Sequence, residues 1–523
     1  MTDAPSSTTG MKKTLGLTGV TVNAMALIAP GAFLWITYQL QAANVDSAGN
    51  STAHDMWTGI VVALIVAFLT AFAYSELARR YPEAGTGSAY YFSEKAFLDR
   101  EEPSHRRWAR IFKFVTGWAA HLFYWVYPGV MVAFMATLIT YIASQFGIAI
   151  PLVGQIIIAC LFSALVGYIA IRGITGSTNV AIAINIIQLT TLVIFSVLAI
   201  AFRNSNPLHV DASGWYFQGG GDIVNPLAQL HTMAGLLFQS TIAILILVGF
   251  ESSTALAAEA KNPRRDIPRA VILSLLIQGV FAYLFEYFSA NYALGSWLGN
   301  DVAGKGINAA AASGAPIGDM AIKIGNSMLG GNGFALMIVL AISVAIAILG
   351  TTLAAMNTGV RISFAMAQDK EMPELMGALH GRFATPHMGL VVMVIVSAVI
   401  GAIGLVGGAV TLTGITLASN LGTFVLYGII CAVTIVAFAG RKEFHRIRHL
   451  TVPVLGLIGN IIMVGAIFII GIATGGTTAQ ETYLGLGISA LWLIVSVVYF
   501  VINSRQTGKA IIPTVEAMRG VGD

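Results

Sequence analysis

The chain has 523 residues, of which 56% are hydrophobic and only 10% are charged. So little charge over this length excludes a soluble globular protein and indicates a polytopic membrane protein. The net charge of +4 requires no nucleic-acid partner, because cytoplasmic loops that face anionic lipid carry such an excess.

The apolar runs predict an all-α protein with twelve transmembrane helices, since each span needs about 20 mainly apolar residues. The polar, Ser/Thr-rich N-terminus has no signal-peptide pattern, so the first span is expected to be retained. The two cysteines lie inside apolar segments, which predicts neither a disulfide nor a metal site. The spans are expected at residues 14–43, 55–78, 114–143, 151–171, 178–202, 233–260, 268–295, 334–366, 387–408, 411–438, 450–474 and 483–503.

The positions of Lys and Arg predict the orientation of these spans. With an even number of spans both termini share one side of the membrane, and 25 of the 28 Lys and Arg residues fall in segments on that side. The positive-inside rule therefore predicts a cell-membrane protein with both termini in the cytoplasm. The three exceptions are Arg203, Lys305 and Lys323.

The first span contains a break formed by Ala29, Pro30, Gly31 and Ala32. Pro30 removes a backbone donor and clashes with the preceding turn, while Gly31 tolerates unwound dihedral angles. A half-helix that begins near this point would present free N–H groups and a positive dipole end to the membrane centre, which suits a substrate carboxylate. We therefore predict that these four residues bind substrate. An ordinary proline kink is the alternative interpretation.

The third span contains one polar residue of interest, His121, between Trp118 and Trp125. Two interpretations stay open, because the imidazole would either line the substrate pocket or form an interhelical hydrogen bond. His121 is included among the predicted substrate-binding residues on the first interpretation.

The sixth span is interrupted near its middle by Leu247-Val-Gly-Phe-Glu-Ser-Ser-Thr254. A carboxylate and exposed backbone groups are costly in hydrocarbon, so Glu251 indicates a functional site. We expect Glu251 to pair with an ammonium group or to take up a proton, and the aromatic ring before it to close over the substrate as a gate. The alternatives are a carboxyl group satisfied by the two serines that follow it, and an aromatic ring that only packs in the core. The predicted substrate contacts here are Gly249, Phe250, Glu251 and Ser252.

The seventh span carries a second intramembrane carboxylate, Glu286, near Tyr283 and Tyr287. An ionisable residue inside the membrane is by default a functional candidate. We predict a role for Glu286 in coupling or gating, as a second cation site or a proton relay.

The order of the spans predicts an internal repeat. Spans 1–5 and spans 6–10 each begin with a broken helix, and because five is odd the second set is inverted relative to the first. This is a 5+5 inverted repeat with broken helices 1 and 6. The expected divisions are a cytoplasmic tail at 1–13, the first repeat at 14–202, an extracytoplasmic loop at 203–232, the second repeat at 233–438, helices 11 and 12 at 439–504 and a cytoplasmic tail at 505–523.

Three groups of motifs occur in order along the chain. They are Phe72-Ala-Tyr-Ser-Glu-Leu-Ala with Tyr81-Pro-Glu-Ala-Gly-Thr-Gly-Ser-Ala-Tyr90, then Gly249-Phe-Glu-Ser with Glu259-Ala-Lys-Asn-Pro-Arg-Arg-Asp-Ile-Pro268, then Arg361-Ile-Ser-Phe-Ala-Met-Ala-Gln-Asp-Lys-Glu-Met-Pro373. Together they resemble the amino acid–polyamine–organocation (APC) superfamily of transporters, and the chain is similar to its amino acid permeases. The resemblance covers at least residues 14–440. It implies the APC-like 5+5 inverted-repeat fold, with a central site between helices 1, 3, 6, 8 and 10.

The chain departs from the family pattern in two places. Ala29-Pro-Gly-Ala32 stands where a Gly-Ser-Gly-like break is common in the first helix. Gln188 aligns with a lysine that some proton-coupled members carry in helix 5, and a glutamine cannot titrate. The coupling route through that lysine is therefore expected to be absent.

The leading hypothesis for function is a secondary-active transporter that moves an amino acid or related amine by alternating access. The sequence contains no Gly-x-x-x-x-Gly-Lys-Ser/Thr motif for ATP, so transport is expected to draw on an ion or exchange gradient. Glu251 favours proton coupling, exchange (antiport) is also favoured, and sodium symport stays open. Sodium coupling would need oxygen ligands such as Thr351 and Thr352, but such hydroxyls usually bond their own helix. The alternative is a cationic amine or polyamine importer or antiporter, favoured by Glu251 together with Glu286.

Two other classes of function are disfavoured by the sequence. A channel would need rings of charge or a repeated filter sequence, and a membrane-embedded enzyme would need clustered catalytic or metal-ligating residues. The sequence has neither. The expected partners are therefore the small-molecule substrate, the lipid bilayer and H⁺ or Na⁺, with no cofactor.

Overall fold

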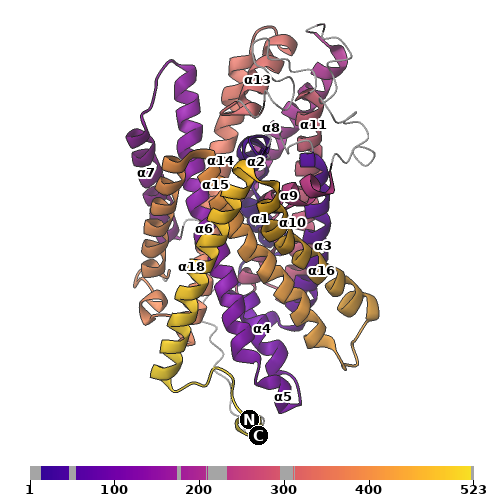
Figure 1. The fold of residues 1–523 in the computed structure, drawn as a ribbon, viewed down its shortest axis with the longest axis vertical. Coiled ribbons are helices and arrows are strands. Elements are labelled where there is room, and N and C mark those ends of the chain that lie inside the picture. The colour runs from indigo at the N-terminus through magenta and orange to yellow at the C-terminus, as the bar shows by residue number, and fades with distance from the viewer. Residues whose placement is uncertain are drawn as a thin grey trace.

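The computed structural model describes residues 13–45, 47, 55–173, 178–207, 209, 232–294, 310, 313–383 and 385–519. These residues form a bundle of long helices, and the only β-type pairing among them is an isolated bridge between Leu15 and Ala260 (Figure 1). Lys305, the predicted N-terminal tail through residue 12 and most of the predicted loop at 203–232 lie outside the described residues. The helical architecture confirms the predicted all-α polytopic membrane protein.

The first half of the chain forms the elements α1 to α8. Their bounds are α1 Leu17–Ile28, α2 Pro30–Ala42, α3 Met56–Arg80, η2 Pro82–Gly87, α4 Ala89–Leu98, α5 Pro103–Arg106, α6 Ala109–Gln145, α7 Leu152–Arg172 and α8 Thr178–Ser205. Figure 1 shows α4 and α5 at one end of the bundle and α13 at the other, with the long helices between them.

The second half of the chain begins with α9. The bounds are α9 Met233–Ala243, η5 Ile244–Ile246, η6 Phe250–Leu256, α10 Pro263–Leu275, η7 Leu276–Leu284, α11 Phe285–Leu294, α13 Pro316–Met328, α14 Gly333–Gln368, η8 Glu374–Gly377, α15 His387–Phe438, η9 Ile447–Thr451, α16 Val452–Gly465, η10 Ala466–Ile470, α17 Gly471–Thr474, α18 Gly476–Thr507 and α19 Val515–Arg519.

Nine helices in the described part of the chain are long and apolar enough to cross a membrane. Three differences separate this count from the twelve predicted spans. The first span is divided by a break into two short helices, the seventh span is divided among α10, η7 and α11, and the ninth and tenth spans form the single element α15. The count of twelve spans, the inverted repeat and the division into repeats and tails stay predictions.

The chain reverses direction inside α15, at Gly408. This glycine has a positive φ of 65° and a non-helical ψ of −156°, a combination that residues with a side chain avoid. On its two sides, Met393 and Ser419 both reach the same turn of α6: Met393 lies with Tyr124 beside Gly359, and Ser419 bonds the carbonyl of Phe123. Because both arms return to one level of α6, α15 is two antiparallel segments that meet where the sequence separates spans 9 and 10.

The first helix break is confined to a single residue. The α1 helix ends at Ile28, Ala29 adopts a left-handed conformation with φ of 35°, and α2 restarts at Pro30. Proline disfavours helical dihedrals in the residue before it and is well suited to the first position of a new helix. The predicted interruption is therefore present, and the second half-helix begins one residue earlier than expected.

The second helix break is much longer. The α9 helix ends at Ala243, earlier than the interruption predicted to begin at Leu247, and the 3-10 segments η5 and η6, with a turn between them, replace α-helix through Leu256. Gly249 lies in the middle with φ of 126°, a conformation that L-residues rarely adopt. This span therefore crosses the centre of the bundle with its α-helical hydrogen bonds interrupted, as the sequence predicted.

Candidate functional site

Glu251 lies at the centre of the second break and is held by three hydrogen-bond donors. The Tyr124 hydroxyl of α6 donates to Oε1 at 3.0 Å, and the Tyr427 hydroxyl of α15 donates to Oε2 at 2.8 Å. The backbone N–H of Gly249 donates to Oε2 at 3.0 Å. Glu251 is only 2% exposed, so burial removes its hydrogen bonds to water, and the three bonds from the protein take their place.

The donor count leaves one position on Glu251 open. A carboxylate accepts about four hydrogen bonds, two at each oxygen, and among the described residues the hydrogen bond found at Oε1 is the one from Tyr124. Among the described residues Glu251 forms no ion pair with Lys, Arg or His. The carboxyl group is thus oriented by neutral donors, and its free acceptor position suits an ammonium group or a proton.

Aromatic rings surround the backbone beside Glu251. The Phe250 ring lies 6.0 Å from the ring of Tyr74 and 5.3 Å from that of Tyr427, and those two tyrosines lie 5.9 Å apart, all measured between ring centroids. Phe250 is completely buried. Aromatic faces attract cations, so this cluster favours the same charge that Glu251 does.

The two helix breaks touch each other at Gly249. A Cβ atom built on Gly249 would lie 3.0 Å from both Leu27 Cβ and Ile28 Cγ1 at the end of α1. Only a residue without a side chain allows this close approach, and the positive φ of Gly249 also requires glycine. Glu251 is consequently placed next to the point where α1 gives way to α2.

The end of α1 is tied to two other helices through one carbonyl group. The carbonyl of Leu27 accepts hydrogen bonds from the Thr351 hydroxyl at 2.7 Å and from the Tyr127 hydroxyl at 3.4 Å. The Thr352 hydroxyl bonds its own helix, at the carbonyl of Ile348. Thr352 therefore bonds its own helix, as the sequence interpretation expected of both threonines, whereas Thr351 bonds α1 instead.

The predicted carboxylate-binding residues lie at the start of α2. Ala29 and Ala32 are buried, and Gly31 packs against Leu192 of α8 and Val344 of α14. No side chain caps the helix, and the first N–H groups of any α-helix have no intrahelical acceptor. The side chain of Pro30 is outside the described part of the structure.

The serine that follows Glu251 plays a local role. The Ser252 hydroxyl donates to the carbonyl of Gly249 at 2.6 Å, and the Ser253 hydroxyl donates to the carbonyl of Phe250 at 2.7 Å. These bonds satisfy carbonyl groups that the 3-10 segment exposes. The donors to Glu251 are instead two tyrosines from distant helices, which the sequence analysis did not identify.

The structure does not bring His121 to Glu251. The two ring nitrogens of His121 lie 2.7 Å from the Gly117 carbonyl and 2.9 Å from the Ser363 hydroxyl of α14. His121 borders a separate cavity between α6, α14 and α18. The interhelical hydrogen bond is therefore the interpretation that the geometry supports.

Glu286 lies on α11 and is also buried. Its Oε2 atom has no hydrogen-bond partner among the described residues. The side chains of Tyr283 and Tyr287, which the sequence places nearby, fall outside the described part of the structure. Glu286 takes no part in the hydrogen-bonded group around Glu251.

On the side where α4 and α5 lie, polar contacts join the second break and the segment after it to neighbouring parts of the chain. Arg361 of α14 pairs with Glu259 at 2.6 Å, and the Ser88 hydroxyl bonds that of Thr254 in η6. The backbone N–H groups of residues 14 and 15 both donate to the carbonyl of Glu259 at 3.0 Å. The chain before α1 is thus fastened to the segment that follows the second break.

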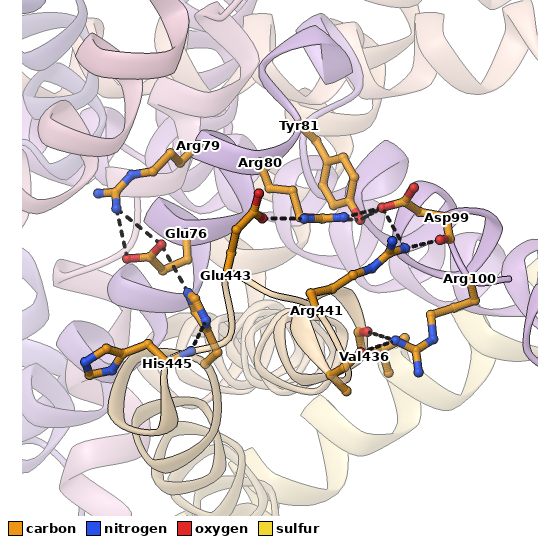
Figure 2. Close-up of polar contacts among 12 residues, drawn as sticks. Glu76, Arg79, Arg80, Tyr81, Asp99, Arg100, Val436, Arg441, Glu443 and His445 are labelled. Atoms are coloured by element: carbon orange, nitrogen blue, oxygen red, sulfur yellow. Dashed lines mark hydrogen bonds and ion pairs between the residues drawn. The ribbon is translucent and has the colours of Figure 1, made fainter.

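A second group of ion pairs lies at the same end (Figure 2). Arg80 at the end of α3 pairs with Asp99 at 2.5 Å and with Glu443 at 3.1 Å, and Arg441 also pairs with Asp99. Burial raises the pKa of Tyr81 to about 12, so its hydroxyl stays protonated and donates to Asp99 at 3.3 Å. Partly exposed pairs stabilise little individually, and their effect here is to hold α3, α4 and α15 in register.

Among the described residues no cluster of His, Cys, Asp and Glu has the geometry of a metal site.

Comparisons with known proteins show what the chain resembles. The sequence model of a protein family described as amino acid permease matches residues 13–491. The chain is 25% identical to an uncharacterized transporter of Mycobacterium tuberculosis over 92% of this chain and 91% of that one. It is 23% identical to a low-affinity putrescine importer of Escherichia coli over 94% and 93% of the two chains. It is 30% identical to an L-methionine/branched-chain amino acid exporter of Escherichia coli over 52% and 54%.

Proposed function

Because the chain belongs to the amino acid permease family and is a multi-pass membrane transporter of amino acids or amines, we propose that its substrate binds where the two helix breaks meet. The observation that carries this proposal is Glu251, a buried carboxylate that three neutral donors orient while one acceptor position stays open. A membrane-buried carboxylate without a cationic partner is costly unless a ligand or a proton compensates it.

In this proposal the two ends of an amino acid meet opposite ends of helices. The ammonium group bonds Oε1 of Glu251 beside the aromatic cluster, and the carboxylate meets the N–H groups at the start of α2. A helix N-terminus favours anions because its N–H groups and its dipole both point at the ligand. The contact between Gly249 and Ile28 supports this arrangement, since it brings the two half-sites together.

Transport in this proposal follows from alternating access. Release to the cytoplasm requires the pair between Arg361 and Glu259 and the bond between Ser88 and Thr254 to open. One acceptor position on Glu251 cannot hold a proton and an ammonium group at the same time, so proton symport in this proposal places the transported proton on the second buried carboxyl group, Glu286. The orientation assumed is the one predicted from charge, with both termini in the cytoplasm.

A second candidate is a transporter of cationic amines, either an importer or an antiporter. The specific observation in its favour is the pair of buried carboxylates, Glu251 and Glu286. The similarity to a putrescine importer points the same way. A diamine would need two anionic contacts and no helix N-terminus.

Uptake into proteoliposomes tests the proposal. Purified protein is reconstituted, and uptake of labelled L-leucine and labelled putrescine is followed with and without an inward proton gradient. We expect saturable uptake of leucine that unlabelled leucine inhibits and the gradient accelerates. Saturable uptake of putrescine alone would favour the second candidate. Flux that does not saturate, or chemical conversion of the substrate, would contradict the assignment as an amino acid transporter.

A further inference from the structure

A cavity separate from the Glu251 site lies between α6, α14 and α18. Its volume is about 230 Å³, and it lies beside His121 of α6. Tyr124, one turn further along α6, donates to Glu251 instead. The walls are mainly aromatic and include Phe114, Trp118, Trp492, Tyr499 and Phe500.

One wall of this cavity is exposed on the outside of the bundle. Val495 and Tyr499 line the cavity, yet their exposed fractions are 50% and 36%. Both belong to α18, a helix long and apolar enough to cross the membrane. Side chains exposed on such a helix face hydrocarbon, so the cavity can be reached from the bilayer.

Cationic side chains gather at the end of the cavity nearest the start of α6. Arg110 and Lys113 line it together with the carboxylate of Glu371. Arg110 pairs with Glu371 at 2.9 Å, and Lys113 pairs with two carboxylates, Asp369 at 2.6 Å and Glu94 at 2.7 Å. Arg107 precedes Arg110 by three residues, outside the residues that line the cavity, and its guanidinium lies over the ring of Trp108. Its Nε atom has no hydrogen-bond partner among the described residues, and Arg107 forms no ion pair with any of them.

We propose that this cavity binds an anionic phospholipid of the cytoplasmic leaflet. An acyl chain enters from the bilayer past Val495 and Tyr499 and occupies the aromatic cavity, while the phosphate lies against Arg107 and Arg110. Apolar walls at acyl-chain depth and cations at headgroup depth match the two parts of this molecule. Basic pockets between helices on the cytoplasmic side are suited to anionic headgroups for the same reason.

The proposal does not depend on which substrate the protein transports. Its site shares no residue with the hydrogen-bonded group around Glu251. A lipid that binds only the folded state raises the melting temperature, which provides a readout independent of transport.

Lipid-dependent melting of the detergent-purified, delipidated protein tests the proposal. The probes are dioleoylphosphatidylglycerol, which is anionic, and dioleoylphosphatidylcholine, which is zwitterionic, each added in mixed micelles. We expect the anionic lipid to raise the melting temperature by about 3 °C more than the zwitterionic lipid. Equal shifts with the two lipids would overturn the proposal.

Three variants locate the effect. Ser496→Trp fills the cavity from α18 and should abolish the extra shift, whereas Ile494→Trp adds the same ring to a position on α18 that is 61% exposed and should keep it. Retention of the full shift in Ser496→Trp would refute the site. Arg107→Gln leaves the cavity intact and should remove only the preference for the anionic lipid. If Ser496→Trp does not fold, an unchanged preference in Arg107→Gln refutes the proposal on its own.

Discussion

The two intramembrane carboxylates of this protein have opposite surroundings. Glu251 is buried but receives hydrogen bonds from Tyr124, Tyr427 and the Gly249 backbone. Glu286 is buried as deeply, yet its Oε2 atom has no partner among the described residues. Glu251 lies in the 3-10 segment η6, whereas Glu286 lies in the first turn of the α-helix α11, directly after the π-helix η7.

The difference in hydrogen-bond donors distinguishes a carboxylate that the protein orients from one that it buries without a donor at Oε2 among the described residues. Donors orient Glu251 and compensate its charge, so it can stay ionised and bind a cation. An ionised Glu286, whose Oε2 atom has no donor among the described residues, would be costly in an apolar interior, so we expect it to carry a proton when no cation is near. Glu251 is consequently our candidate for substrate recognition, and Glu286 for coupling.

The largest expected effect comes from removing the charge of Glu251. Glu251→Gln keeps the shape of the side chain but cannot pair with an ammonium group, and losing one partner of a buried charge pair corresponds to about 100-fold in affinity. We expect saturable leucine uptake in proteoliposomes to fall by about that factor. Wild-type uptake with unchanged pH dependence in this variant would remove Glu251 from the site.

A smaller effect is expected from Gly249→Ala, which strains the contact between the two breaks. The new Cβ would lie 3.0 Å from Leu27, at a φ of 126° that costs an alanine about 2 kcal/mol. We expect about 30-fold weaker substrate binding in a thermal-shift titration. Gly350→Ala is the matched control, because a Cβ there meets nothing within 4 Å. Equal losses in both variants would contradict a special role for Gly249.

Removing one donor to Glu251 should have a moderate effect. Tyr427→Phe deletes a hydrogen bond to a charged group, which is worth about 1.5–3 kcal/mol, and we expect roughly tenfold weaker substrate binding. Tyr74→Phe serves as the control, since the Tyr74 hydroxyl is buried without a partner among the described residues although its ring packs in the same cluster. A larger loss of substrate binding in Tyr74→Phe than in Tyr427→Phe would contradict the role of Tyr427 as a donor to Glu251.

The smallest effect on binding is expected at Glu286. Glu286→Gln removes no hydrogen bond that the described residues make at Oε2, so substrate affinity should change by less than about threefold. The pH dependence of uptake should flatten if this residue carries a transported proton. Affinity and pH dependence are measured separately, by binding titration and by uptake at several pH values. A large loss of affinity would place Glu286 in the substrate site instead.

The fold could be predicted well from local signals. Pro30 and Gly249 marked the two breaks because each has a backbone requirement that holds wherever the residue occurs. The length of the second break could not be predicted, since residues 244–246 are ordinary apolar residues whose 3-10 conformation depends on neighbouring helices. The reversal at Gly408 coincides with the expected boundary between spans 9 and 10.

The candidate site could be predicted only in part. Glu251 was identifiable because a carboxylate inside an apolar run needs an explanation. Its donors, Tyr124 and Tyr427, lie 127 and 176 residues away along the chain, and one sequence carries no signal that pairs them. His121 is one turn from Tyr124 but faces α14, and apolar spans with little periodicity do not reveal which face points inward.

An experimental structure of the substrate-bound protein tests the central claim most directly, through the distance from the substrate nitrogen to Oε1 of Glu251. We predict a hydrogen bond of about 3 Å at Oε1, with the bonds from Tyr124, Tyr427 and Gly249 retained. A substrate bound elsewhere, with no atom of it near the contact between Gly249 and Ile28, would contradict the account.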